Sequence, residues 1–467
     1  MENEEGLVAE KPVVASLIEK NRFRAMENEE GVDAASLGDG LVLRTVRDER
    51  DVERYAAFHA AVVSEMEGIT CAHLLHHHPE IRTGDFLLVE DETTGEVVST
   101  TCLIPWHCRY GEVDLDVAML EMVATHPRYR HRGLVRAQIH RFHRMASERR
   151  FDLCIIEGIP YYYRQYGYAY AVDHWASDSL PAWCIPDEPA GQPRPYRLRR
   201  ATLEDAAVLT SLYQEATASL HNRTLRSPDY WRFLLQWMQY PVQLVEDERD
   251  GRAVGYVVTT ELRNSQGIAA TESGIVSQEV GLAVLRMLKA AVAALMGGEI
   301  RLGWPQTGTL VRLGRSLGSV PLPHDQWLMR IPDVARLLSR IGPILERRVA
   351  ASDCAGLTAE LCLNLFRQAF VLHFEAGRMV RVDAVGFVDA SMGADGGDLC
   401  IPPDAFVRLV LGYRDLDELR DAWPDIVVRP ERRHVLRVLF PKGSSYFSMP
   451  YLYCGPAAGD ANADERG

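Results

Sequence analysis

The run from residue 119 to 136 joins an apolar segment to a basic turn, and this turn could hold an anion. Residues 118–125 have the pattern of a strand, Pro127 ends it, and an amphipathic helix begins at Leu134. Backbone amides at the start of a helix are unpaired and lie at the positive end of the helix dipole, so they attract phosphate groups. The turn holds three basic residues and a glycine that allows close approach: Arg130, His131, Arg132 and Gly133.

A second stretch with reactive side chains follows the next extended segment. Residues 151–157 have the pattern of a buried strand, and Gly158 and a group of tyrosines come directly after it. A phenol is a hydrogen-bond donor at neutral pH, so a tyrosine here could protonate a leaving group. The other interpretation is a packed aromatic cluster, formed by Tyr161, Tyr162, Tyr163, Tyr166 and Tyr168.

Both stretches resemble signatures of one enzyme superfamily. The basic turn is similar to the acetyl-CoA signature of the GCN5-related N-acetyltransferases (GNAT), Arg/Gln-x-x-Gly-x-Gly/Ala, in which Arg130 and Gly133 match and Val135 replaces the last small residue. Tyr163-Arg-Gln-Tyr-Gly-Tyr168 is similar to the later Tyr-x-x-(aromatic)-Gly-(aromatic) signature. The form Arg-x-Arg-Gly-Leu-(apolar)-Arg, at 130–136, is that of the enhanced intracellular survival (Eis) subgroup, which accounts for Val135.

The resemblance implies acetyl-CoA as the co-substrate. Its pantetheine arm would pair like a short strand with the backbone of residues 122–125, and its diphosphate would lie on the amides of residues 131–136. The residues expected to bind acetyl-CoA are Met122, Val123, Ala124, Thr125, Arg130, His131, Arg132, Gly133, Leu134, Val135, Arg136 and Gly158.

Acetyl transfer to an amine needs an oriented thioester, a neutral amine and a stabilised leaving thiolate. Tyr163 matches the superfamily's general acid, and Glu121 lies where other members keep a glutamate that takes the amine proton through water. Proton loss to bulk water is an alternative. In the Eis subgroup the terminal carboxylate takes part in the active site, but here small and acidic residues follow Gly455, so that carboxylate is a poor candidate.

The order of predicted elements divides the chain into three folded parts of mixed α/β (α+β) class. The basic turn follows the fourth predicted strand of a catalytic GNAT domain at 41–185. A loop rich in proline and glycine leads to a second, degenerate GNAT-like domain at 196–322, and the part from 325 to 455 resembles a sterol-carrier-protein-like domain. An acidic, disordered leader, 1–40, and a flexible tail, 456–467, are expected at the ends.

The second GNAT-like domain is expected not to bind acetyl-CoA. Where its phosphate turn should lie, residues 273–281 contain no arginine and include Glu279, which would repel a diphosphate. The third part is expected to be a helix at 331–349 and then strands at 356–364, 369–375 and 378–385.

Composition excludes several other classes of protein. The formal net charge of −14 argues against non-specific nucleic-acid binding. No apolar run is long enough to span a bilayer, and the acidic start is unlike a signal peptide. The nine cysteines include no Cys-x-x-Cys pair, which favours reduced thiols and a cytoplasmic location. No metal is expected, because no Cys or paired acid accompanies the histidines His73, His76, His77 and His78.

The function predicted is acetyl transfer from acetyl-CoA to a primary amine of a cationic acceptor, which could be aminoglycoside-like, polyamine-like or a lysine. A homo-oligomer is expected. Two alternatives stay open: a non-catalytic regulator that binds acyl-CoA or lipid, and a transferase of aminoacyl or fatty-acyl groups. Tyr163 favours an enzyme over a regulator, because a protein that only binds has no need of the phenol.

Overall fold

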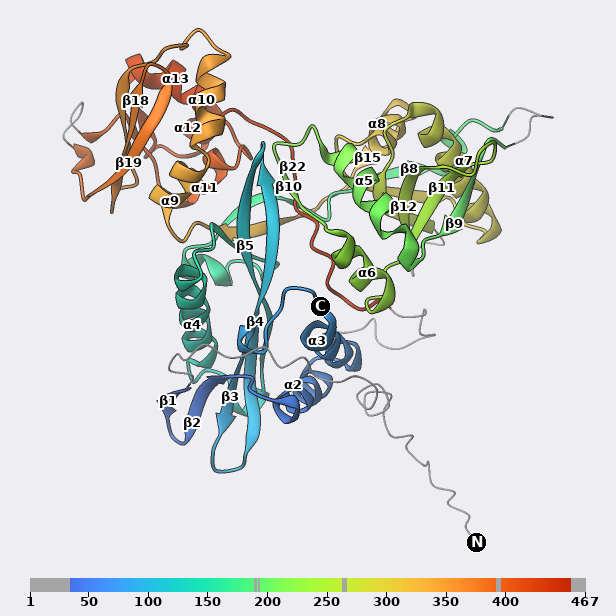
Figure 1. The fold of residues 1–467 in the computed structure, drawn as a ribbon, viewed down its shortest axis with the longest axis horizontal. Helices are drawn as coiled ribbons and strands as arrows, with labels where there is room; N and C mark the ends of the chain where they lie inside the picture. Colours follow the sequence, from blue (N-terminus) through green and yellow to red (C-terminus); the bar gives the residue numbers. More distant parts are fainter. Residues whose placement is uncertain (1–33, 189–190, 192–193, 263–266, 392–395, 455–467) are drawn as a thin grey trace. The chain divides into compact units, whose positions relative to one another are not determined.

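The computed structural model describes residues 34–188, 191, 194–262, 267–391 and 396–454, which form two compact units (Figure 1). Of these residues, the first unit holds 34–102, 122–138 and 451–453, and the second unit holds the others. Strand β5 (Val113–Thr125) and helix α4 (Leu134–Glu148) each give residues to both units.

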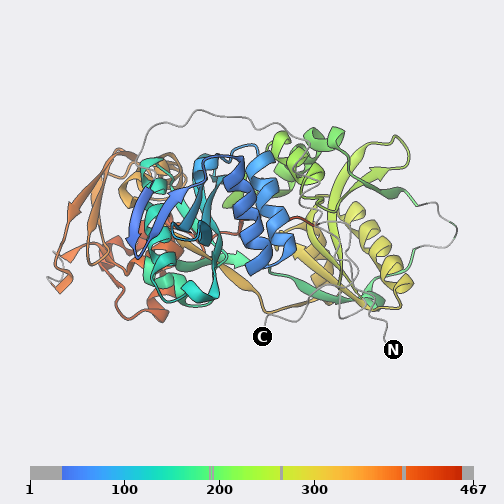
Figure 2. The ribbon, with the colours of Figure 1, turned by 90° about the horizontal axis from the view of Figure 1, so that it is seen from below.

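In the first unit an antiparallel sheet lies beside two helices. The strands pair in the order β1-β2-β3-β4, and the two blue helices α2 and α3 lie side by side in Figures 1 and 2. Asp48 and Ser64 start these helices, because each side chain accepts a hydrogen bond from a first-turn amide. The elements are β1 (Ala34–Gly38), β2 (Leu41–Thr45), α2 (Glu49–Val62), α3 (Glu65–His77), β3 (Phe86–Asp91) and β4 (Glu96–Tyr110), which continues into the second unit.

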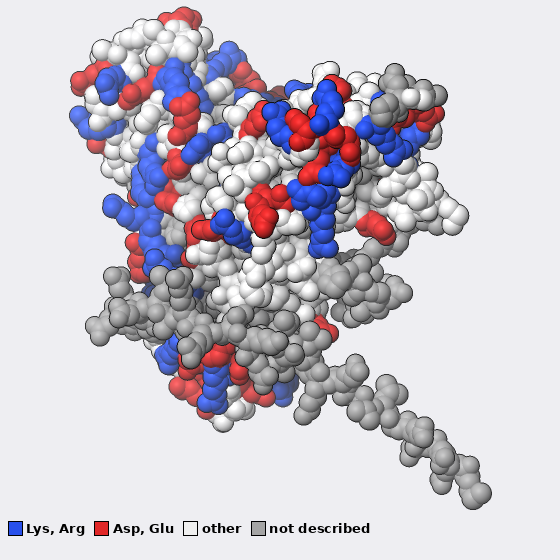
Figure 3. Space-filling view, turned by 45° about the vertical axis from the view of Figure 1, so that its right-hand side comes forward, with Lys and Arg blue, Asp and Glu red and all other residues white. Residues whose placement is uncertain are grey.

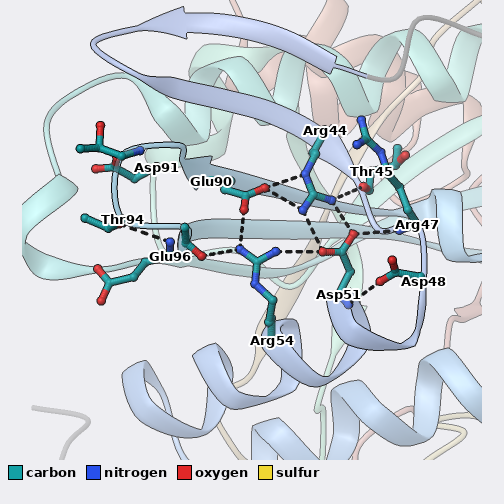
Figure 4. A network of polar contacts seen from close by, with 12 residues as sticks. Arg44, Thr45, Arg47, Asp48, Asp51, Arg54, Glu90, Asp91, Thr94 and Glu96 are labelled. Carbon is teal, nitrogen blue, oxygen red and sulfur yellow. Dashed lines mark hydrogen bonds and ion pairs between the residues drawn. The ribbon is translucent and has the colours of Figure 1, made fainter.

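A closed ring of opposite charges fixes α2 to strands β2 and β3 (Figure 4). Arg44 lies 2.5 Å from Asp51 and 2.7 Å from Glu90, and Arg54 contacts the same two carboxylates at 3.0 Å and 2.7 Å. Burial acts to raise the pKa of Asp51, but the hydrogen bond and the charge of Arg44 outweigh it and hold this pKa below its ordinary value. Arg44, Asp51 and Glu90 are therefore charged together at neutral pH.

The first strand begins earlier than the sequence predicted. The predicted disordered leader, 1–40, includes Ala34–Gly38, but this segment pairs with Leu41–Thr45 as strand β1. The basic turn consequently follows the fifth strand of the described chain and not the fourth. Residues 1–33 and the predicted tail lie outside the described residues.

The first sheet of the second unit contains a strand from far along the chain. The strands pair in the order β5-β6-β16-β7, where β6 is Leu153–Ile156, β7 is Ala169–His174 and β16 is Asp325–Arg330. β5 and β6 run parallel, and β16 is antiparallel to both of its neighbours. Residues 325–330, which the sequence placed in the third part, thus complete the sheet that carries Tyr163.

The second sheet of this unit includes a strand from the predicted first part of the chain. The order is β15-β8-β14-β13-β12-β11-β9, so β8 (Asp178–Pro181), which lies within the predicted first domain (41–185), pairs with β14 of the predicted second domain (196–322). Its Leu180 packs in the same apolar core as Val284 and Leu285 of α7. The other elements are β9 (Tyr196–Arg200), α5 (Ala206–Thr217), α6 (Pro228–Gln236), β11 (Val242–Asp247), β12 (Ala253–Leu262), β13 (Gly267–Gly274), α7 (Gln278–Ala294), β14 (Glu299–Trp304), α8 (Thr309–Ser316) and β15 (Val320–Pro321).

The third sheet has the order β19-β18-β17-β20-β21. Strands β17, β18 and β19 agree with the predicted strands at 356–364, 369–375 and 378–385, whereas the short strands β20 and β21 were not predicted. The helix predicted at 331–349 is two helices, because Pro343 lies in the first turn of α10, where its missing N–H is tolerated. The elements are α9 (Val334–Arg340), α10 (Gly342–Ala350), β17 (Ala359–Asn364), β18 (Ala369–Glu375), β19 (Arg378–Gly386), β20 (Leu399–Cys400), α11 (Pro403–Val410), α12 (Leu416–Ala422), β21 (Val427–Val428) and α13 (Arg433–Leu439).

The segment after α13 returns to an earlier part of the second unit. Strand β22 (Ser445–Tyr446) pairs in parallel with β10 (Asn222–Thr224), which itself pairs with the end of β4. Among the described residues, no helix has both the length and the apolar character needed to cross a bilayer.

Candidate active site

The basic turn has the backbone geometry of an anion site. His131 and Gly133 have positive φ angles of 64° and 78°, and α4 begins at the next residue, Leu134. Gly133 adopts this conformation without strain because it has no Cβ, whereas a branched side chain would not. The first amides of α4 have no partner within the helix, so they are available for an anion. Ile139 and Phe142 are buried on the inner face of α4, as its predicted amphipathic pattern requires.

The arginines of the turn are exposed and only partly engaged. Arg130 donates from Nε to the carbonyl of Thr125 at 3.4 Å, and Arg132 lies 3.1 Å from Asp39 with its guanidinium 5.4 Å from the ring centre of Tyr129. Arg136 is exposed on the first turn of α4. Since these contacts lie at the surface, the guanidinium groups can turn toward a diphosphate at little cost.

Strand β5 bends at Met122, which has a φ of 54°. Such a φ is uncommon in a side-chain-bearing residue and re-aims the adjoining peptide groups. The hydroxyl of Thr100 donates to the Met122 carbonyl at 3.1 Å and lies 2.9 Å from Nε2 of the buried His59. Burial lowers the pKa of His59 to about 4, so the imidazole is neutral and supports the bend without adding charge.

Ser99 joins the end of β5 to α4. Its hydroxyl lies 2.9 Å from the Ala124 carbonyl, 2.7 Å from Thr125 Oγ1 and 2.9 Å from Oε1 of the buried Gln138. The sequence patterns alone do not single out four of these polar residues: Ser99, Thr100, His59 and Gln138. Their one sequence signal is polarity within apolar strands and helix faces, where a buried polar group needs a partner.

The second unit contains the predicted general acid. Tyr163 lies in a 3-10 turn, Tyr162–Tyr166, and is only 5% exposed. Burial raises its pKa well above the ordinary value of a phenol, and the nearby Glu121 carboxylate raises it further. The hydroxyl therefore keeps its proton throughout the physiological range, as an acid must before it donates. The structure thus brings Glu121, a half-buried residue of β5, into the surroundings of Tyr163.

Gly158 lies against the ring of Tyr163. A Cβ at this position would be 2.2 Å from Tyr163 Cδ2 and 2.9 Å from Leu328 Cδ1. The absence of a side chain at 158 therefore lets the phenol ring pack on the backbone, with a residue of the inserted strand β16 on the same side. The predicted role of Gly158 in binding acetyl-CoA stays a prediction.

We expect Gly158→Ala to lower kcat roughly tenfold or more, because displacing the Tyr163 ring by a fraction of an ångström misplaces its hydroxyl. Steady-state kinetics and thermal unfolding would be measured together. Gly298→Ala is the matched control, since a Cβ there would meet no atom within 4 Å and the expected kcat is unchanged. A Gly158→Ala enzyme with the wild-type kcat would mean that the packing of Tyr163 does not matter for turnover.

The four histidines near α3 do not form a metal-sized cluster. In the described ranges, the group of metal-binding side chains found within ligand distance of one another is Asp353, Cys354 and His434. The rings of His73 and His77 lie 5.9 Å apart at a tilted angle of 57°, and burial lowers the pKa of His78 to about 3. The predicted absence of a metal stays a prediction.

Comparison with known proteins identifies the class of the first part. Residues 43–171 match the protein family described as acetyltransferase (GNAT) domain, and this range contains both the basic turn and Tyr163. This part of the chain is therefore similar to the GNAT acetyltransferase domain, a family whose members use acyl-CoA. The predictions of an enzyme of the acyltransferase class and of a mixed α/β fold are confirmed.

Solved structures show how far the fold extends. A probable N-acyltransferase of Enterococcus faecalis V583 superposes with a TM-score of 0.66 and 14% identity, covering 86% of this chain and 98% of its own. A GCN5-related N-acetyltransferase of Anabaena variabilis gives 0.65 and 16%, with 87% and 98% covered. Eis1 of Mycobacterium abscessus gives 0.57 and 16%, with 87% and 99% covered. No curated protein matches the chain in sequence.

We expect the double variant Arg132→Glu, Gly133→Val to raise KM for acetyl-CoA at least about tenfold, which corresponds to about 1.4 kcal/mol of binding. The variant reverses one charge and forces a branched side chain to the φ of 78° at which Gly133 lies. Arg144→Glu is the control, because Arg144 is exposed on the same helix but away from the turn. An unchanged KM in the double variant would mean that the diphosphate is bound elsewhere.

Proposed function

We propose that this protein transfers the acetyl group of acetyl-CoA to a primary amine of a cationic acceptor, such as an aminoglycoside-like compound, a polyamine or a lysine. The observation that carries the proposal is Tyr163, a buried phenol held in its protonated form inside the matched acetyltransferase range. A phenol in this state can donate to a leaving thiolate, and a protein that only binds acyl-CoA gains nothing from it.

The other residues divide the remaining tasks. The amides at the start of α4 and the guanidinium groups of Arg130, Arg132 and Arg136 would bind the diphosphate. The bend at Met122 would present backbone groups of β5 to the pantetheine arm. Glu121 would take the amine proton through water, and its nearby charge also favours the protonated phenol of Tyr163.

The same proposal covers the whole chain. The second and third sheets would be a GNAT-like domain without acetyl-CoA and a sterol-carrier-protein-like domain, in a cytoplasmic homo-oligomer. The second sheet supports this because Glu279, where a phosphate turn would lie, accepts a hydrogen bond from Tyr196 at 3.1 Å. A fixed carboxylate at this place opposes a diphosphate. Light scattering of the purified protein would measure the oligomer.

The acceptor must be recognised by local groups as well as by overall charge. The formal net charge is −14, but where charged side chains gather on the face in Figure 3, acidic and basic ones lie next to one another. Between charges that alternate in this way, long-range attraction is largely screened at physiological salt. A cation would therefore be bound at a particular carboxylate.

The test measures thiol release from acetyl-CoA with polyamines, aminoglycosides and lysine peptides as acceptors. Acceptor-dependent release is expected with at least one amine, and calorimetry should show acetyl-CoA binding without any acceptor. Binding of acetyl-CoA with no turnover on any amine would favour the non-catalytic regulator. A protein that does not bind acetyl-CoA at all would overturn the proposal.

A further inference from the structure

A carboxylate and an exposed indole meet beside the backbone that supports Tyr163. Glu157 directly precedes Gly158, the residue on which the Tyr163 ring packs. Its Oε1 accepts a hydrogen bond from Trp175 Nε1 at 3.2 Å, and its Oε2 lies 3.2 Å from His174 Nε2. Glu157 and Trp175 come from the ends of β6 and β7, so two strands place this pair.

The indole is displayed to solvent by a strained backbone. Trp175 is 55% exposed and has a φ of 53°, a conformation that a bulky side chain rarely adopts. Beneath it, His174 contacts the fully buried Trp327 of β16 with 3.8 Å between ring centres, and Trp327 donates to the Phe447 carbonyl at 3.0 Å. Buried contacts therefore support the residue next to the exposed indole. Exposure is unusual for a tryptophan, because most of its side chain is ordinarily buried.

This pair has the chemistry of an ammonium-binding site. A carboxylate can accept hydrogen bonds from several donors at once, and Glu157 already lies near two of them, Trp175 and His174. The side chain of Glu157 is 36% exposed, which leaves it within reach of a solute. The face of an indole attracts a cation through its quadrupole, and tryptophan does so more strongly than tyrosine or phenylalanine.

The charge of Glu157 decides which amine it can serve. The reacting amine must be neutral when it attacks, and a carboxylate in contact with it would favour its protonated form. Glu157 is therefore unsuited to the reacting nitrogen. It suits a second ammonium group of the same acceptor, which stays charged throughout the reaction.

We propose that Glu157 and Trp175 form a subsite for the non-reacting ammonium of an acceptor that carries two or more amines. This inference rests on the proposed function and deepens it, because it assigns the discrimination between multi-amine and single-amine acceptors to two named residues. The subsite binds and orients the acceptor and takes no part in the proton transfers.

The experiment compares two acceptors of equal chain length, 1,4-diaminobutane and 4-amino-1-butanol, which differ in one terminal group. Glu157→Gln should raise KM for the diamine about five- to tenfold and leave KM for the amino alcohol and for acetyl-CoA unchanged. Trp175→Leu should raise KM for the diamine in the same direction. Glu148→Gln, an exposed carboxylate at the end of α4, is the matched control and should change neither KM.

Direct binding separates a failure of this inference from a failure of the proposed function. Equilibrium dialysis with 1,4-diaminobutane should show weaker binding to Glu157→Gln than to the wild type, whether or not turnover occurs. If dialysis shows this difference but no acceptor is turned over, the subsite proposal is supported and the proposed acetyltransferase function is rejected. The subsite proposal would be overturned if the Glu157→Gln enzyme turned over both acceptors with wild-type KM values. It would also be overturned if the substitution raised the KM values for both acceptors equally.

Discussion

Tyr163→Phe is expected to lower kcat about a hundredfold or more and to leave the affinity for acetyl-CoA nearly unchanged. A general acid contributes on this scale, and phenylalanine keeps the ring that packs on Gly158 while it removes the proton. Single-turnover kinetics would measure the chemical step, and calorimetry would measure acetyl-CoA binding. Tyr162→Phe is the matched control, because the neighbouring half-buried phenol lies 3.3 Å from the hydroxyl of Tyr166 and has no assigned role.

The pH profile provides a second readout of the same residue. Because burial and the Glu121 carboxylate raise the pKa of Tyr163, its phenol stays protonated as the pH rises through the ordinary tyrosine value of about 10. The kcat of the wild type should therefore show no fall below that pH from loss of this proton. A kcat of Tyr163→Phe equal to that of the wild type would remove Tyr163 from the mechanism.

Glu272→Gln is expected to destabilise the protein by about 3–5 kcal/mol, the usual effect of removing one partner of a buried ion pair. Arg226 and Glu272 have side chains 0% and 2% exposed and form two parallel contacts of 2.7 Å. Tyr256 and Ser448 donate to Glu272 at 2.8 Å and 3.0 Å, and Tyr446 donates to it as well. Neutralising Glu272 leaves the buried guanidinium without its counter-charge.

Chemical denaturation would measure this loss. Asp229→Asn is the control, since Asp229 pairs with Arg232 at the surface and the expected change is within about 1 kcal/mol. Arg226→Met combined with Glu272→Leu should lose less than the sum of its two single variants, because no charge is left buried alone. If the free energy of unfolding of Glu272→Gln lay within about 1 kcal/mol of the wild-type value, the buried ion pair would not stabilise the fold as expected.

Low pH should reduce the stability that the Arg226–Glu272 ion pair contributes. Burial acts to raise the pKa of Glu272, but the charge and hydrogen bonds of Arg226 outweigh it, so the pKa in the folded protein lies below its ordinary value. The stability from this pair is therefore complete at pH values above the ordinary glutamate pKa and is lost as the pH falls through the folded value. The difference between the wild type and Glu272→Gln should shrink over that range.

The sequence predicted the local parts of the candidate site more fully than the sheets that carry them. The strand, basic turn and helix through Leu134 are set by nearby residues, namely Pro127, Gly133 and the apolar spacing that follows. Periodicity likewise predicted β17, β18 and β19 closely. The resemblance at Tyr163 pointed to the residue whose surroundings now support a protonated phenol.

Strand pairing over long distances was beyond the sequence pattern. Asp178–Pro181 lies in the predicted first part and Asp325–Arg330 in the predicted third part, but each pairs with a strand of another part. The residues of an apolar strand do not indicate which sheet it joins. The subsite of Glu157 and Trp175 was missed for the same reason, because its two residues meet only once β6 and β7 are positioned. The bend at Met122 could not be predicted, because the residue with the positive φ is not a glycine.

The insertion of β16 between β6 and β7 has a consequence for synthesis on the ribosome. The sheet that carries Tyr163 lacks an interior strand until residue 330 has left the exit tunnel, and β10 lacks its parallel neighbour until Tyr446 has followed. Long loops must therefore close before the sheet that carries Tyr163 is complete, and this slows its folding. A gene fragment that stops near 185 should yield an aggregation-prone polypeptide with two unpaired β-edges, so functional dissection of this protein calls for point variants over truncations.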